Sequence, residues 1–403
     1  MIARVHLIYY FTVSVIIFLL SDALSVLFPT FLEFKISYFL KGSVFFFYLV
    51  LAIKILSIKN LFLASFFVII FATSQSYLFY VDKINFIGLI DNLRFFIWYF
   101  FGVILIFLFN KNDLDSIALN LLEKLNKVAL LIITIVCISV LIGFIFNLEV
   151  LESYDGSRWG YKGILSKSIT TSYFFIISLN YLYYDAVILK KKNFFFTLVL
   201  LCSLLTGTKS IYLFLLLLLF FDIISQKRYK LKSFWFVFIT IVFLMVVFRE
   251  KILKMTDFVT GLFYRLYQEK GLMYSLTSYR SEMLIDGINY YRSQWNWVNY
   301  LIGGRLIEIR YFEMSFFDLF YFFGSIGFLL FLYILIKHLI IPFFKKTAIS
   351  GLFIICSVLL VAFFSGQFFN NSTVIILFFY FLLLIRLNLT YYEQDKHPKH
   401  LHS

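Results

Sequence analysis

Long apolar runs recur along the whole chain, and short charged stretches separate them. Hydrophobic residues make up 62% of the sequence and charged residues only 14%, whereas a soluble domain carries about a quarter charged residues. A protein interior of this size could not hold so many apolar side chains, so lipid must cover part of them. Because a helix needs roughly 20 mostly apolar residues to cross a bilayer, we predict an all-α polytopic membrane protein with about 12 transmembrane helices.

One apolar run is long enough for two of these helices. The run over residues 193–225 is interrupted at Thr206-Gly207-Thr208-Lys209, where glycine beside lysine would be unfavourable in the middle of a bilayer. We therefore predict two helices joined by a tight hairpin. The predicted spans are residues 7–28, 36–57, 60–80, 93–110, 128–147, 166–189, 193–208, 210–225, 233–249, 313–337, 350–366 and 371–387.

The positive charge orients these predicted helices. The formal net charge is +14, which in a soluble protein would suggest a nucleic-acid partner, but here the cations cluster in short stretches between apolar runs. Such clusters mark the cytoplasmic side of membrane proteins. Those within residues 190–192, 227–232 and 337–346 then fall on one side, which places both termini in the cytoplasm. We expect one membrane-embedded domain over residues 1–403 and no nucleic-acid partner.

Two loops on the outer side carry most of the distinctive polar residues. The shorter loop covers residues 148–165, and the larger loop covers residues 250–312. Apolar residues at helical spacing predict one short helix early in the large loop, and the segment from Ser278 to Tyr291 predicts another. On the cytoplasmic side, an apolar stripe over residues 114–125 predicts a separate amphipathic helix.

Arginines are the most distinctive residues of the two outer loops. A guanidinium stays charged and binds phosphate or carboxylate through paired hydrogen bonds. A single arginine in such a loop is more often solvated or held in an ion pair, but a set of six, interspersed with aromatic rings that can stack on sugars, favours an anionic ligand. The set is Arg158, Arg265, Arg280, Arg292, Arg305 and Arg310, with Trp159, Trp295 and Trp297 among them.

A lysine and three carboxylates lie near the outer ends of predicted helices. Lys209 is at the tip of the predicted hairpin, where it could extend to the membrane surface or contact a phosphate. Glu313 and Asp318, five positions apart, begin an otherwise apolar span. The helix dipole stabilises acids at such a position, whereas an acid deeper in a span, as with Asp318 and Asp22, usually faces a polar cavity or a cation.

The other reactive residue types predict no metal site and no bound cofactor. Cys137, Cys202 and Cys356 lie within apolar runs and lack metal-binding spacing. None of the five histidines lies in an outer loop. The sequence also contains no phosphate-loop motif, dinucleotide-binding glycine fingerprint or nucleophile elbow. We therefore expect a chain that uses no soluble nucleotide.

Several short motifs follow one another in the outer loops and at the ends of the neighbouring spans. They are Gly156-Ser157-Arg158-Trp159-Gly160-Tyr161-Lys162-Gly163, Leu204-Leu205-Thr206-Gly207-Thr208-Lys209-Ser210, Ser278-Tyr279-Arg280, Leu301-Ile302-Gly303-Gly304, Glu313-Met314-Ser315-Phe316-Phe317-Asp318 and Gly324-Ser325-Ile326-Gly327-Phe328. In this order they resemble the bacterial O-antigen polymerase and O-antigen ligase superfamily. The resemblance covers about residues 90–385 and rests on order and topology, since each motif is short.

This resemblance implies a GT-C-like glycosyltransferase without a cofactor, which uses polyprenyl-diphosphate-linked oligosaccharides at the periplasmic face of a bacterial inner membrane. Arg158, Lys209 and Arg280 match positions where the family keeps basic residues, although arginine is commoner at the position of Lys209. Arg292 and Gly303 fit a spacing described for polymerase loops. The candidate residues are then Arg280, Glu313 and Asp318 for catalysis, and Arg158, Lys209, Arg292, Arg305 and Trp159 for binding the diphosphate and sugars.

The distribution of histidines separates the two branches of the superfamily. Ligases resemble one another in a histidine at the end of the large outer loop, where this chain has Glu313. The expected function is therefore polymerisation of repeat units for O-antigen, lipopolysaccharide or capsule, with a flippase and a chain-length regulator as implied partners. The alternatives are the ligase and a transporter that moves lipid-linked oligosaccharides. Transporters typically have paired halves, whereas this chain has one large loop without a counterpart.

Overall fold

The helical class predicted from the sequence is confirmed by the computed structural model. It describes residues 2–28, 36–81, 83–110, 119–154, 159–188, 194–248, 267–269, 271, 274, 280–304 and 312–396. Within these ranges the regular structure is helical, and the one strand-like feature is an isolated antiparallel bridge between Glu152 and Tyr161. Arg158, Arg265, Arg305 and Arg310 lie outside the described residues, as does the first predicted helix of the large loop.

Each predicted span overlaps one helix. These helices are α1 (Ile2–Leu27), α2 (Ile36–Ile55), α3 (Ile58–Tyr80), α4 (Phe86–Phe109), α5 (Leu119–Phe146), α6 (Ser168–Tyr183), α7 (Phe194–Leu204), α8 (Lys209–Ser225), α9 (Lys232–Val247), α15 (Ser315–Leu335), α16 (Ile341–Ser365) and α17 (Ser372–Lys396). Among the described residues, seven helices are long and apolar enough to cross a bilayer: α1 to α5, α15 and α17. The chain is therefore a multi-pass membrane protein, and the count of twelve spans stays a prediction.

Two local predictions are decided by the helix boundaries. The predicted hairpin is confirmed, because α7 ends at Leu204 and α8 begins at Lys209. The prediction of a separate amphipathic helix over residues 114–125 is wrong for residues 119–125, which form the first turns of α5. Its apolar stripe continues into the apolar run that follows, and Leu122 and Leu125 are buried in the bundle core.

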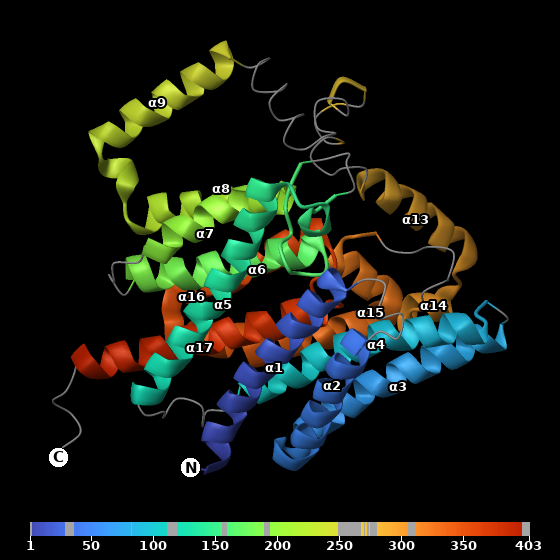
Figure 1. Ribbon diagram of the computed structural model, residues 1–403. Helices are drawn as coiled ribbons and strands as arrows, with labels where there is room; N and C mark the ends of the chain where they lie inside the picture. Colours follow the sequence, from blue (N-terminus) through green and yellow to red (C-terminus); the bar gives the residue numbers. More distant parts are fainter. Residues whose placement is uncertain are drawn as a thin grey trace.

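Helix α17 lies at the centre of the bundle and packs against α1, α4, α5 and α6 (Figure 1). Every residue from Ser372 to Asn388 is buried, as expected for a helix that is apolar on all sides and enclosed by other helices. Arg386 is the charged exception, and its guanidinium donates to the backbone oxygen of Phe109 at 2.8 Å. The start of α1 and the end of α17 lie on the side of the view away from α13 and α14.

The described end of the large loop is anchored to the bundle by aromatic packing. It forms α13 (Arg280–Gln294) and α14 (Trp297–Ile302), and α13 confirms the short helix predicted from Ser278 to Tyr291. Tyr291 stacks on Tyr321 of α15 with ring centroids 4.2 Å apart, and Trp295 packs edge-on against Tyr291 at 4.8 Å. The loop helices are thus seated on α15 beside the end of α3.

Two glycines bring the loop backbone into direct contact with α15. Gly303 follows α14 with φ 79°, and Gly324 interrupts α15 with φ 67° and ψ −174°. A Cβ on Gly303 would lie 2.5 Å from the backbone nitrogen of Gly324, and a Cβ on Gly324 would lie 2.3 Å from that of Gly303. Side chains avoid both the backbone angles and the contact distances, so only glycine fits at this crossing.

Replacing Gly303 with alanine is expected to destabilise the folded protein. Backbone strain alone should cost about 1–3 kcal/mol, and the contact with Gly324 adds to it. Thermal denaturation of the detergent-solubilised protein would measure the loss. The matched control is Gly42→Ala in α2, because a Cβ there has nothing within 4 Å. Equal melting temperatures for the two variants would contradict the described crossing.

Candidate functional site

The described part of the shorter loop, predicted over residues 148–165, is held against the α7–α8 hairpin by backbone contacts. Tyr161 N–H donates to the Leu205 oxygen at 3.0 Å, and a Cβ on Gly207 would lie 2.1 Å from the Trp159 oxygen. Burial and the nearby Glu152 carboxylate raise the pKa of Tyr161, whose neutral phenol donates to the Asn147 amide oxygen at 2.6 Å. The sequence motifs around residues 156–163 and 204–210 therefore meet in space.

The hairpin is also fixed to the start of α6. The Ser172 hydroxyl donates a hydrogen bond to the Thr208 Oγ1 at 2.8 Å, and both side chains are buried. The Thr171 hydroxyl donates to the Lys162 backbone oxygen at 2.8 Å, which ties the end of the short loop to the same helix. Lys162 and Lys209 are thereby carried on segments that are braced by α6.

The turn between α16 and α17 presses against the start of α15. Gly366 has φ 65°, and a Cβ there would lie 2.2 Å from the Glu313 carbonyl carbon. Glu313 and Gln367 both have φ 54°, a left-handed conformation that non-glycine residues rarely adopt. Strained backbone of this kind is concentrated at functional sites, where the surrounding structure holds it. Here the Tyr173 hydroxyl donates to the Gly366 oxygen at 3.0 Å and fixes the turn.

Arg280 and Glu313 form the central ion pair of this region. Arg280 is the first residue of α13, and its Nε and one terminal nitrogen donate to the Glu313 Oε2 at 3.2 and 3.1 Å. The other terminal nitrogen donates to the Phe364 oxygen at 3.4 Å. The side chains retain 23% and 42% exposure, so the guanidinium is positioned by the protein and is still open to a ligand.

These segments enclose a cleft of about 490 Å³ with an excess of positive charge. Among the described residues, the cations that line it are Lys162, Lys167, Lys209 and Arg280, and the one carboxylate is that of Glu313. Cations gathered around a cleft attract anions and raise their local concentration. The remaining lining is largely hydroxyl, amide and backbone groups: Ser153, Tyr154, Ser166, Ser168, Ile169, Ser172, Thr208, Ser210, Ser365 and Gln367. The cleft therefore suits an anionic, polar ligand.

The cleft contains three of the predicted site residues, Arg280, Glu313 and Lys209. Arg292 and Trp159 are not among its lining residues. Arg292 is exposed near the far end of α13, about 18 Å from Arg280 along the helix axis at 1.5 Å per residue. Trp159 packs edge-on against Phe144 and Tyr161, with centroids 6.2 and 6.3 Å away.

Asp318 is not one of the lining residues of the cleft. Its side chain is 8% exposed, and Oδ1 accepts a hydrogen bond from the Phe312 backbone N–H at 2.8 Å. The carboxylate thus fixes the chain just before Glu313 as it enters α15. This hydrogen bond holds the residue before Glu313, the other predicted acid, which itself lines the cleft.

Lys162, Lys167 and Gln367 were not among the predicted site residues, although they line the cleft. Lys162 is inside the motif 156–163, and Lys167 immediately precedes α6. Both lysines lie in or beside the predicted short outer loop, contrary to the usual preference of cations for the cytoplasmic side. That departure is the signal in the sequence that could have identified them.

Comparisons of this chain with protein-family models, with curated proteins and with solved structures gave no match.

Proposed function

We propose that the chain is a polymerase of oligosaccharide repeat units, acting on polyprenyl-diphosphate-linked glycans. The observation that carries it is the cleft, whose described lining brings together four cations and one carboxylate. A diphosphate is the anionic ligand best matched to several cations that include a guanidinium. The resemblance of the motif order to the O-antigen polymerase and ligase superfamily supports the same substrate class, as does the position of the cleft in a multi-pass membrane protein.

In the proposed reaction, a hydroxyl of one lipid-linked repeat unit attacks the anomeric carbon of a second lipid-linked glycan. A new carbon–oxygen bond forms as the bond between that carbon and the diphosphate oxygen breaks. The electron pair leaves with the polyprenyl diphosphate, whose developing charge Arg280 and the lysines would stabilise. Glu313 would accept the proton of the attacking hydroxyl. The step needs no nucleotide, because the diphosphate is already the leaving group.

The proposed orientation places this cleft outside the cytoplasm of a bacterium. Its lining residues come from the ends of helices that the cation clusters assign to the outer side. An impermeant maleimide added to intact inner-membrane spheroplasts should label Trp297→Cys, which replaces a side chain that is 74% exposed on α14. Lys230→Cys should react only after permeabilisation. Both variants carry Cys356→Ser, because Cys356 is the exposed native cysteine among the described residues. The reverse labelling pattern would contradict the orientation.

Deletion of the gene in its native host tests the proposed function. Surface polysaccharide should shorten to a single repeat unit, and expression of the intact chain should restore long chains, as resolved by gel electrophoresis. The two alternatives predict other phenotypes. Loss of a transporter would retain single lipid-linked units on the cytoplasmic face, and loss of a ligase would leave long chains attached to the polyprenyl carrier. Either of those results would contradict the polymerase.

A further inference from the structure

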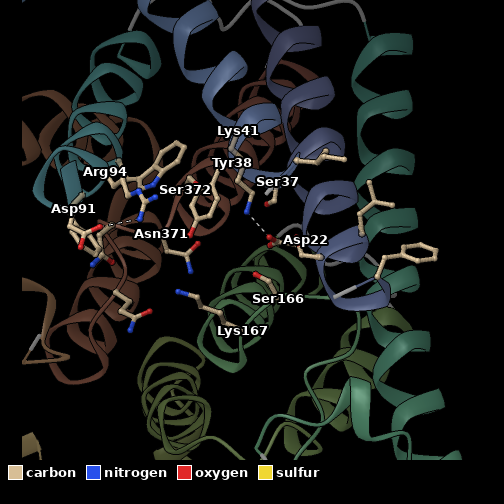
Figure 2. A pocket seen from close by; sticks show the side chains of 18 residues that line it. Asp22, Ser37, Tyr38, Lys41, Asp91, Arg94, Ser166, Lys167, Asn371 and Ser372 are labelled. Carbon is tan, nitrogen blue, oxygen red and sulfur yellow. Dashed lines mark hydrogen bonds and ion pairs between the residues drawn. The ribbon is translucent and has the colours of Figure 1, made fainter. Parts of the chain in front are cut away.

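A second pocket of about 630 Å³ adjoins the cationic cleft and shares Ser166, Lys167 and Gln367 with it. Its other walls come from the end of α1, the first turns of α2, residues 91–98 of α4, and the turn before α17. Figure 2 shows Tyr38 entering this pocket from above and Lys167 from below. Its volume is within the range of roughly 300–1,000 Å³ found for small-molecule sites.

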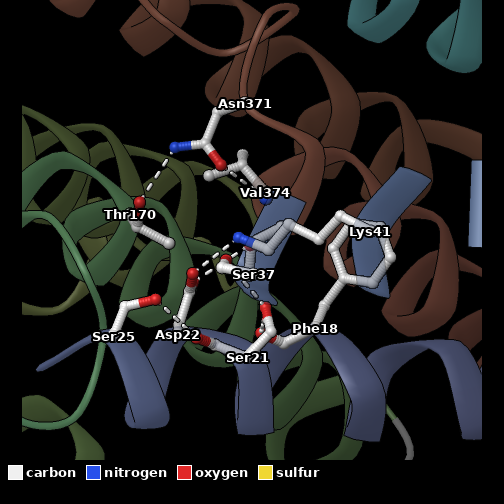
Figure 3. A network of polar contacts seen from close by, with 10 residues as sticks. Phe18, Ser21, Asp22, Ser25, Ser37, Lys41, Thr170, Asn371 and Val374 are labelled. Atoms are coloured by element: carbon white, nitrogen blue, oxygen red, sulfur yellow. Dashed lines mark hydrogen bonds and ion pairs between the residues drawn. The ribbon is translucent and has the colours of Figure 1, made fainter. Parts of the chain in front are cut away.

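Two of the three cations that line the described part of this second pocket form ion pairs with carboxylates. Lys41 pairs with Asp22 at 2.6 Å, and Arg94 pairs with Asp91 at 3.1 Å. Asp22 is 1% exposed and also accepts a hydrogen bond from the Thr373 hydroxyl at 3.0 Å. Figure 3 shows this pair beside Ser37. Among the described residues, the lining therefore holds three cations and two carboxylates, a smaller excess of positive charge than that of the cleft.

The remaining lining combines hydrogen-bonding groups with aromatic rings. Hydroxyls and amides are supplied by Ser25, Ser37, Ser166, Gln367, Asn370, Asn371 and Ser372, and rings by Phe28, Tyr38, Phe95 and Trp98. Sugar hydroxyls both donate and accept hydrogen bonds, so they suit a wall of amides, hydroxyls and paired charges. The apolar face of a sugar ring packs on aromatic side chains. The half-exposed pair of Asp91 and Arg94 can take part in such contacts.

We infer that this second pocket binds the saccharide part of the lipid-linked substrate whose diphosphate occupies the cleft. The inference rests on the proposed function and adds a location for the glycan. Lys167 lines both spaces, so it marks the junction at which the sugar meets the diphosphate. A neutral polyhydroxylated ligand fits the paired charges here, and the diphosphate fits the cleft, whose described lining holds four cations and one carboxylate.

Calorimetry on the purified full-length protein can measure binding to each of the two spaces separately, because a different ligand is expected in each. One is the free repeat-unit oligosaccharide, released by mild acid from the lipid-linked intermediates of the deletion strain. The other is undecaprenyl diphosphate without a sugar. The variant Tyr38→Ala/Asp91→Ala should weaken oligosaccharide binding about tenfold, from the lost stacking and hydrogen bonds. It should leave undecaprenyl diphosphate binding unchanged, which also shows that the variant is folded.

The matched control is Tyr80→Ala, which removes an 85% exposed tyrosine that lines neither space. It should leave binding of both ligands unchanged. If Tyr38→Ala/Asp91→Ala bound the oligosaccharide as tightly as the unaltered chain, the location of the glycan would be wrong. The proposed function would still stand if Arg280→Ala lost binding of undecaprenyl diphosphate. If the unaltered chain bound neither ligand, the proposed function and this inference would both fail.

Discussion

Replacement of Arg280 by alanine is expected to slow the addition of repeat units by about 10²–10³-fold, the usual effect of removing one preorganised group that stabilises developing charge. Among the described residues that line the cleft, Arg280 is the one guanidinium. Its bonds to Glu313 and to the Phe364 oxygen fix it before substrate arrives. Chain length and rate can be measured in membranes that contain each variant at equal abundance.

Two further variants identify which property of Arg280 matters. Arg280→Lys keeps the charge and loses the planar fork, so it should recover part of the rate. Arg292→Ala removes an exposed arginine from the same helix, outside the cleft, and should have little effect. An unimpaired Arg280→Ala variant, or an Arg292→Ala variant that is equally impaired, would contradict the role given to the cleft.

Replacement of Asp22 by alanine should give the largest loss of stability, about 3–5 kcal/mol, because it leaves a buried ammonium without its counter-charge. The side chains of Lys41 and Asp22 are only 11% and 1% exposed. Thermal denaturation measures the loss, and the double variant Asp22→Leu/Lys41→Met should recover most of it, since it removes both charges together.

A second ion pair in the same pocket provides the control. The side chains of Arg94 and Asp91 are 53% and 50% exposed, and they are three positions apart on α4. Exposed pairs contribute little to stability, so Asp91→Ala should leave the melting temperature nearly unchanged. If Asp22→Ala were equally benign, the pair with Lys41 would not be desolvated as described.

Much of the helical framework could be predicted from the sequence because lipid makes apolar length a strong signal. The hairpin break at Gly207 and the short helix α13 follow from local residues, and both are confirmed. The amphipathic stripe over residues 114–125 was misleading, because its apolar face continues into the longer run of α5. An apolar stripe alone does not show where one helix ends.

The candidate site was only partly predictable, because it depends on contacts between distant segments. Arg280 and Glu313 were chosen separately, and their pairing across 33 residues depends on how α13 sits against α15. Arg292 is on the same helix as Arg280 but lies three turns away, which charge alone does not reveal. The crossing of Gly303 and Gly324, which seats the loop, leaves no signal in residue type except the glycines themselves.

The proposed polymerase would join lipid-linked repeat units without a nucleotide. The most direct measurement uses the purified protein in liposomes that contain only its polyprenyl-diphosphate-linked repeat unit, followed by electrophoresis of the glycans and assay of the released carrier. A polymerase should produce a ladder of longer glycans and release one polyprenyl diphosphate for each new bond. Folded protein that binds the substrate and leaves it as single units would contradict the proposed function.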